Sequence, residues 1–87
     1  MNVLVRQGLS SRTFEASDQD LTNASYQYFG FLTADKNWVI QRFDLTVSNV
    51  ITYRYATAYN NLSYGAYVAA WTDRASLNYG YFYETGL

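Results

Sequence analysis

Apolar and polar residues alternate along much of the chain with the period of two that is typical of β-strands. Short polar stretches rich in Asn, Asp and Gly separate the alternating segments, and such stretches are typical of turns. The pattern predicts strands over residues 24–32, 38–43, 50–57 and 77–83. The polar residues 33–37 predict a hairpin turn between the first two strands, and Ser48-Asn49 predicts a second turn before the third.

The segment 50–57 has the clearest strand pattern. Ile51, Tyr53 and Tyr55 alternate there with polar or small residues. Aromatic and β-branched residues are enriched in strands, where they pack on a half-buried surface. We therefore expect the rings of this strand to point inward to the core and its polar groups to point outward to solvent.

Residues 66–71 interrupt the alternation. Tyr67, Trp71 and Arg74 follow one another at spacings of four and three residues, which places them on one face of a helix. This spacing predicts a helix of about two turns or an irregular corner. Several short strands with at most one short helical turn predict an all-β fold, either a small antiparallel β-sandwich or a barrel.

The N-terminal residues differ from the remainder of the chain. They contain one aromatic residue, Phe14, and a long polar stretch. Val3 and Val5 alternate with their neighbours in a way that allows an edge strand. We expect residues 1–22 to form an N-terminal arm or edge strand and residues 23–87 to form one compact β domain.

Composition and charge exclude several classes of protein. The chain has 87 residues, with 6 Lys and Arg against 7 Asp and Glu, and its cations are scattered singly. Nucleic-acid binding depends on a surplus of basic residues that displaces counterions, so DNA and RNA are not expected as partners. No apolar run approaches the ~20 residues that a membrane-spanning helix needs, so no membrane partner is expected.

The inventory for catalysis and metal binding is also poor. The chain has no His and no Cys, which removes the commonest general base, the imidazole metal ligand and the thiolate. Asp18-Gln19-Asp20 is spaced like the start of a calcium loop, but Asn23 stands where that loop needs Gly. Nothing in the sequence holds two carboxylates at the separation that glycoside hydrolysis requires. We predict that the chain is not an enzyme and has no metal or cofactor.

Aromatic residues are unusually abundant. Ten Tyr, five Phe and two Trp make up 20% of the chain, whereas charged residues make up 15%. A domain of this size cannot bury every ring, and exposed aromatic patches are typical of interfaces. Residues 77–83 are apolar on both faces, so this strand is expected between two layers or under a partner subunit. The candidate interface residues are Tyr59, Tyr64, Tyr79, Tyr81, Phe82 and Tyr83.

A second group of residues predicts a structural corner, and its members are Trp38, Arg42, Trp71 and Arg74. Arg74 is expected to bind a carboxylate or to stack on a ring, for example that of Trp38. The functional alternative is that Arg74 holds a bound anion.

The segments 38–42 and 71–79 carry a resemblance to a known group of proteins. They read W-x-I-x-R and W-x-x-R-A-S-L-x-Y, and the intervening residues predict a strand and a variable loop. This pattern resembles short proteins encoded among the structural genes of tailed bacteriophages, over about residues 26–81. The resemblance implies a virion-associated β-domain.

These observations lead to two hypotheses of function. The first is a structural component of a phage particle, such as a capsid decoration, collar or tail protein, which packs aromatic surfaces against other virion proteins or copies of itself. The alternative is a carbohydrate-binding or host-attachment module whose exposed Tyr and Trp stack on the rings of a glycan. A sugar site needs one or two rings beside fixed polar groups in a shallow cleft, whereas assembly needs a broad apolar patch.

Overall fold

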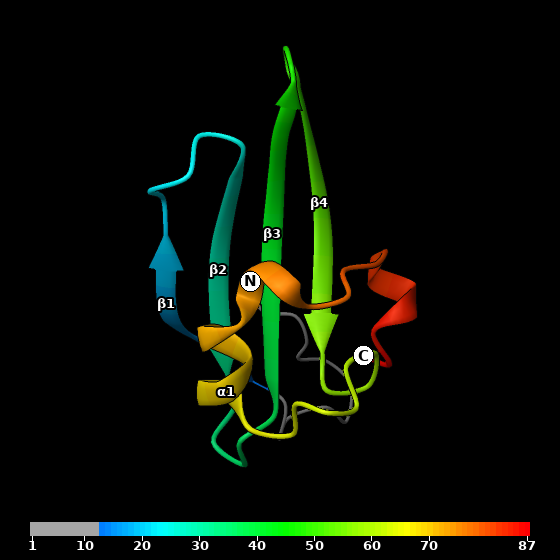
Figure 1. The fold of residues 1–87 in the computed structure, drawn as a ribbon. Coiled ribbons are helices and arrows are strands. Elements are labelled where there is room, and N and C mark those ends of the chain that lie inside the picture. The colour runs from blue at the N-terminus through cyan, green and yellow to red at the C-terminus, as the bar shows by residue number, and fades with distance from the viewer. Residues whose placement is uncertain (1–12) are drawn as a thin grey trace.

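A single antiparallel sheet forms the framework of the protein (Figure 1). The computed structural model describes residues 13–87, and the strand predicted around Val3 and Val5 lies outside them. The strands follow the chain in the order β1-β2-β3-β4, and each pairs antiparallel with the next. Their bounds are β1 Glu15–Asp20, β2 Tyr26–Leu32, β3 Trp38–Val47 and β4 Val50–Thr57. The prediction of an all-β, antiparallel fold is confirmed.

Both predicted hairpin turns are present. Residues 33–37 join β2 to β3, and Lys36 adopts a φ of 72° there. Ser48 and Asn49 join β3 to β4, and Asn49 has a φ of 64°. Asn adopts this left-handed conformation more readily than most residues, because its short polar side chain tolerates it. The local turn chemistry therefore explains why β3 and β4 reverse at this point.

The C-terminal segment crosses one face of the sheet and supplies the second layer (Figure 1). It contains the helix α1, Tyr67–Thr72, and the single-turn 3-10 helices Arg74–Ser76 and Phe82–Glu84. The short helix predicted at residues 66–71 is confirmed. No helix in residues 13–87 combines the length and apolar character needed to cross a membrane.

The prediction of a strand over residues 77–83 is wrong. Gly80 alone makes a β-bridge there, exchanging two 2.9 Å backbone hydrogen bonds with Tyr55 of β4. Immediately afterwards the Tyr81 N–H donates to the Glu84 carboxylate at 2.7 Å, which starts the last 3-10 turn. The alternating rings of this segment therefore do not form a further full strand: Tyr79 packs beside Tyr28, and Tyr83 stacks on Tyr81.

The core lies between the sheet and the C-terminal segment. Its buried members are Tyr28, Trp38, Ile40 and Ala56 from the sheet and Tyr67, Ala70 and Leu77 from the segment. Gly30 of β2 allows the close approach of the two layers, because a Cβ atom there would overlap the Tyr67 hydroxyl and lie 3.0 Å from the Trp71 ring. Replacing this hydrogen with a side chain would push the helix away from the sheet.

The prediction for the faces of β4 is wrong. Ala56 faces the core and is fully buried, whereas Ile51 and Tyr53 lie on the opposite face and are about half exposed. Alternation shows that the two faces of a strand differ, but it does not show which face another layer will cover. Here the C-terminal segment packs on the face that carries the small Ala56 side chain.

Candidate interaction surface

Large exposed apolar side chains gather along β4 and the C-terminal residues beside it. We call this set the β4 surface, and its members are Val47, Val50, Ile51, Tyr53, Tyr81, Phe82 and Tyr83. The Gly80 bridge to Tyr55 holds the C-terminal rings next to the strand. The ring of Phe82 meets that of Tyr55 edge to face, with 5.4 Å between their centroids. The contact between Phe82 and Tyr55 therefore joins the exposed C-terminal rings to the exposed side of β4.

The tip of the β3–β4 hairpin extends this surface away from the body of the protein (Figure 1). Pairing between β2 and β3 ends at Tyr26 and Asp44, and one further backbone hydrogen bond of 2.8 Å runs from the Leu45 N–H to the Ser25 carbonyl. Beyond Leu45 the hairpin strands pair with each other. Residues 45–53 contain no charged side chain. The hairpin thus presents Val47 and Val50 to solvent at a projecting, uncharged tip.

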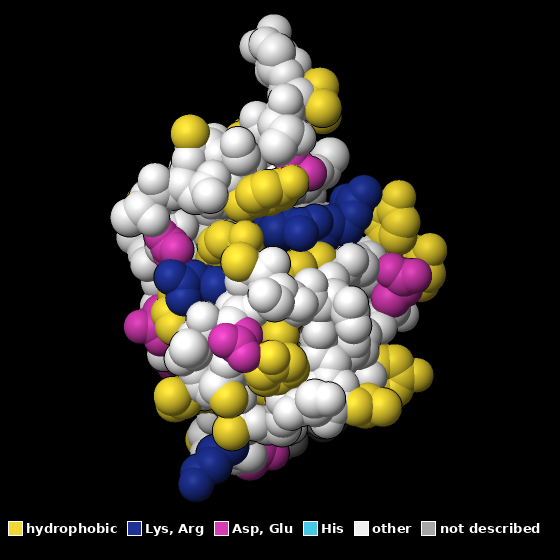
Figure 2. Space-filling view, viewed as in Figure 1, with side chains coloured by type: hydrophobic (Ala, Val, Ile, Leu, Met, Phe, Trp, Pro, Cys, Tyr) yellow, Lys and Arg dark blue, Asp and Glu magenta, His cyan; other side chains and the backbone are white. Residues whose placement is uncertain are grey.

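Two arginines lie at the base of this hairpin, on the face that carries the C-terminal segment. Arg42 and Arg54 are direct cross-strand partners, and like charges in this position repel. The Arg42 guanidinium lies 5.1 Å from the ring centre of Tyr26 and 4.5 Å from that of Tyr79, and Arg54 lies 4.2 Å from that of Tyr81. Figure 2 shows cationic side chains set between hydrophobic ones on this face. The rings offset part of this repulsion through cation–π contacts.

Arg42 also has a buried polar atom without a hydrogen-bond partner in residues 13–87. Its Nε is buried and has no hydrogen-bond partner among the described residues. A buried donor without a partner destabilises a fold, so the position of Arg42 depends on the flanking rings. The neighbouring Asp44 carboxylate accepts hydrogen bonds from the hydroxyl and the backbone N–H of Thr46. Both bonds lower the pKa of Asp44, and the bond from the hydroxyl has the larger effect.

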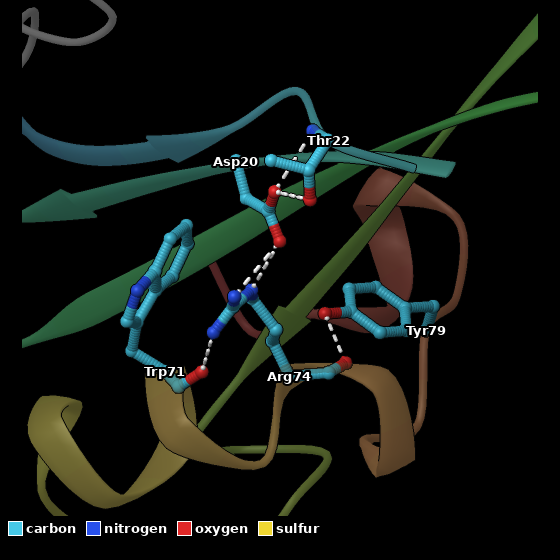
Figure 3. Close-up of polar contacts among 5 residues, drawn as sticks. All are labelled: Asp20, Thr22, Trp71, Arg74 and Tyr79. Atoms are coloured by element: carbon cyan, nitrogen blue, oxygen red, sulfur yellow. Dashed lines mark hydrogen bonds and ion pairs between the residues drawn. The ribbon is translucent and has the colours of Figure 1, made fainter. Parts of the chain in front are cut away.

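Arg74 lies near the opposite edge of the sheet, beside β1, and its guanidinium has a carboxylate partner (Figure 3). Its Nε and Nη2 donate to one oxygen of Asp20 at 3.1 and 2.8 Å, and its Nη1 donates to the Trp71 carbonyl at 2.7 Å. Its guanidinium also stacks on the Trp71 ring at 4.5 Å. The pKa of Asp20 is lowered to about 2, chiefly by hydrogen bonds from Thr22 and to a smaller extent by the contact with Arg74. This corner ties the C-terminal segment to β1.

The other members of the predicted corner lie apart from Arg74. Trp38 is buried in the core, where its indole N–H donates to the Tyr64 carbonyl at 3.2 Å, so the ring that stacks on Arg74 is that of Trp71. Arg42 belongs to the pair with Arg54 described above. Each nitrogen of the Arg74 side chain already donates a hydrogen bond within the protein, so the geometry favours a structural contact over a bound anion.

The candidate interface residues divide into two groups. Tyr59, Tyr81, Phe82 and Tyr83 are exposed. Tyr64 and Tyr79 pack against the core, and their hydroxyls donate to Asp73 at 2.7 Å and to the Arg74 carbonyl at 2.8 Å. Burial raises the pKa of Tyr79.

Sequence reasoning missed the hairpin part of the surface, whose members are Val47, Val50, Ile51 and Tyr53. The uncharged stretch of residues 45–53 around a two-residue turn is the signal that could have identified it.

A separate shallow cavity of about 190 Å³ lies over β1 and β2. It is lined by Ala16, Ser17, Asp18, Gln19, Phe29, Gly30 and Phe31. Its volume is below the roughly 300–1,000 Å³ that small-molecule sites occupy. Residues 13–87 also contain no group of three or more acidic side chains placed to hold a metal ion.

Comparison of the chain with models of protein families, with curated proteins and with solved structures finds no match.

Proposed function

We propose that the chain is a non-enzymatic structural component of a tailed-phage particle. It acts by packing the β4 surface against other virion proteins or copies of itself. The observation that carries this proposal is the row of exposed aromatic and aliphatic side chains from the hairpin tip to Tyr83, together with the absence of charge over residues 45–53. The resemblance of residues 38–42 and 71–79 to phage structural proteins supplies the virion as the setting.

The chemistry of the surface suits protein–protein packing. Aromatic side chains bury a large area and lose few rotamers when they are held, and they dominate the energetics of many interfaces. The Tyr81 ring has contacts within the single chain, because it stacks on Tyr83 with ring centroids 5.6 Å apart and lies against Arg54 at 4.2 Å. A partner therefore meets a preorganised surface, which lowers the entropy cost of binding.

The same contacts count against the sugar-binding alternative. A sugar ring stacks on the open face of an aromatic side chain beside fixed polar groups. Both Tyr81 and Tyr83 direct a face at each other, since their planes are 5° from parallel, and Tyr81 also packs against Arg54. A broad packing surface agrees better with this arrangement than a cleft for one sugar does.

Co-sedimentation with particles tests the proposal. Particles from the source culture are separated on a density gradient, and quantitative peptide mass spectrometry measures the copy number of the chain per particle. We expect a fixed copy number that survives high salt, because apolar packing is not screened by ions. The double variant Tyr81→Ser/Tyr83→Ser should lose incorporation.

The matched control is Leu62→Ser/Val68→Ser, which removes two strongly exposed apolar side chains outside the β4 surface. This control should be incorporated like the wild type. The proposal is overturned if the wild-type chain stays at the top of a gradient that contains intact particles. It is equally overturned if the Tyr double variant enters particles at the wild-type copy number.

A further inference from the structure

The outer edge of β4 forms backbone hydrogen bonds with Gly80 near one end, whereas near the other end its backbone groups are open to a partner. Tyr55 directs both of its backbone groups outward, because they bond to Gly80 and not to β3. Backbone direction alternates along a strand, so Ile51, Tyr53 and Thr57 also direct their N–H and C=O groups outward. The edge is free for a partner where these outward groups have no hydrogen bond within the chain.

Side chains of the protein itself close part of this edge. The Thr57 N–H donates to the Asn60 side chain at 2.8 Å, and the Tyr53 carbonyl accepts from Arg54 Nη1 at 2.9 Å. The N–H and C=O of Ile51 and the N–H of Tyr53 have no hydrogen-bond partner among the described residues. The open stretch is therefore the distal half of β4, beside the exposed side chains of the β4 surface.

The opposite edge of the sheet is protected. The strand β1 carries Glu15, Asp18 and Asp20, and its pairing with β2 shifts register between Ala16 and Asp18. Charged residues and bulges of this kind prevent an edge strand from pairing with another chain. The distal half of β4, Val50 to Tyr53, carries neither a charge nor a proline. Two copies of this stretch of β4 can thus approach each other with no like charges face to face, whereas two copies of the β1 edge cannot.

We propose that the open edge of β4 pairs with the same edge of a second copy of the chain. The two strands run antiparallel about a two-fold axis at Thr52, so the two sheets join into one continuous sheet. This inference deepens the proposed function, because it names the partner that the β4 surface takes, and it rests on that function for the use of the surface.

The register follows from the open groups. With Thr52 on the axis, Ile51 of each copy faces Tyr53 of the other, and their outward N–H and C=O groups form the hydrogen bonds of the pair. The Arg54 side chain releases the Tyr53 carbonyl to make these bonds. Pairing stops beyond Arg54, because Gly80 already occupies the edge at Tyr55. Gly80 therefore limits the pair to the open stretch and sets its register.

The same register brings the apolar side chains together. The hairpin turn of each copy lies beside the C-terminal segment of the other, so Val47 and Val50 approach the rings of Tyr81 and Phe82. The Arg54 side chains of the two copies lie four residue positions apart along the strands, which is about 13 Å. This separation exceeds the Debye length of about 8 Å at physiological salt, so the two charges repel weakly.

Two-fold pairing predicts a closed dimer and no larger assembly. Each copy uses its open edge once, and an isologous contact leaves no second open edge to continue the sheet. Light scattering after size exclusion, over a tenfold concentration range, should show a species of twice the 10.0 kDa chain mass. The Ile51→Pro variant should remain a monomer with unchanged far-ultraviolet circular dichroism, because the N–H that it removes is unused within one copy.

Ile51→Lys provides a second variant should proline disturb the hairpin, since it adds a charge to the edge without changing the backbone. It should also be a monomer. Val68→Lys makes a comparable change on the exposed side of α1 and should remain a dimer.

A cross-linking experiment tests the position of the axis directly. The chain has no Cys, so Thr52→Cys introduces a single thiol. Residues that face each other in a non-hydrogen-bonded antiparallel pair have Cα atoms about 4.5 Å apart, close enough for a disulfide. Mild oxidation should link Thr52→Cys chains into covalent dimers at least tenfold faster than chains with the control substitution Thr46→Cys, on the other strand of the hairpin.

The inference is overturned by a wild-type monomer at every concentration, by a dimer that persists in both Ile51 variants, or by equal cross-linking rates of the two thiol variants. These results differ from those that test the proposed function. A monomer in solution that still enters particles overturns self-pairing and leaves the structural role. A Thr52-centred dimer that never enters particles does the reverse.

Discussion

The two sides of the sheet satisfy their polar groups in different ways. On the β1 side, carboxylates bind the C-terminal segment: Asp18 accepts the Tyr67 hydroxyl at 2.8 Å, and Asp20 binds Arg74 at 2.8 Å. On the β4 side, Arg42 and Arg54 face each other without an ion pair to any described residue, and aromatic rings lie against both guanidinium groups. The β1 side pairs its charges within one chain, whereas the β4 side leaves backbone groups and apolar side chains available to a partner.

This difference assigns separate tasks to the two sides. The β1 side supplies stability to the single chain, because its charged groups and its close helix packing hold the two layers together. The β4 side contributes less to the single chain and more to association, because its exposed groups gain partners only when another surface covers them. Variants on the two sides should therefore change different measurements.

The largest effect is expected where the β1 side packs most closely. Gly30→Val should destabilise the protein by about 2–3 kcal/mol, because the new side chain overlaps Tyr67 and displaces α1 from the sheet. Urea unfolding followed by tryptophan fluorescence measures this loss. Gly65→Val is the matched control, since a Cβ atom there meets nothing within 4 Å. Equal losses in the two variants would show that α1 does not depend on a bare backbone at Gly30.

A smaller and pH-dependent effect is expected at the corner between β1 and Arg74. Because the pKa of Asp20 is lowered from 3.8 to about 2 in the folded protein, its contribution to stability is present above about pH 4. The contribution is lost as the pH falls through about 2. Asp20→Asn should lower the urea midpoint at pH 6 and should reduce the drop in midpoint between pH 6 and pH 2.

The control for this pH effect is Asp44→Asn, on the β4 side. Hydrogen bonds from Thr46 also lower the pKa of Asp44, so this variant removes a carboxylate of similar type without touching Arg74. In the Asp44→Asn variant, the drop in urea midpoint that comes from protonation of Asp20 should remain. The comparison of the two sides fails if the two variants have superimposable midpoint profiles between pH 6 and pH 2.

The smallest effect is expected for the arginine on the β4 side. Arg42→Met should change the free energy of unfolding by less than about 1 kcal/mol, because removal of a buried Nε without a partner and of repulsion with Arg54 offsets the lost ring contacts. Arg74→Met should lower the urea midpoint clearly, because it leaves Asp20 without its cation. Parallel urea titrations of the two variants compare them, and a larger loss at Arg42 would contradict this account.

Local patterns predicted much of the fold. The strands β2, β3 and β4, the turns between them and the short helix α1 were all expected from residue alternation, turn residues and helical spacing. These features depend on interactions between near neighbours, which a sequence displays directly. The strand expected at residues 77–83 does not form, because Gly80 alone pairs with β4 and Glu84 then binds the Tyr81 N–H and turns the backbone.

The candidate surface was predicted less completely. Tyr81, Phe82 and Tyr83 are exposed, as expected of interface residues, but Tyr64 and Tyr79 pack against the core, and the aromatic abundance gives no sign of the exposed hairpin tip. The abundance of rings indicates that some must be exposed, but it does not identify them. Exposure depends on which face of the sheet the C-terminal segment covers.

The sequence by itself determined the strand-rich class of the fold, the positions of the hairpin turns and the excess of aromatic residues over what a small core can hold. These properties follow from backbone preferences and composition, which are set residue by residue. Only the tertiary structure decided that Ala56 faces inward while Ile51 and Tyr53 face outward, and that Arg74 meets Asp20 across 54 positions of the chain. Such choices depend on how distant segments pack, because a strand with two usable faces buries the one that another layer fits.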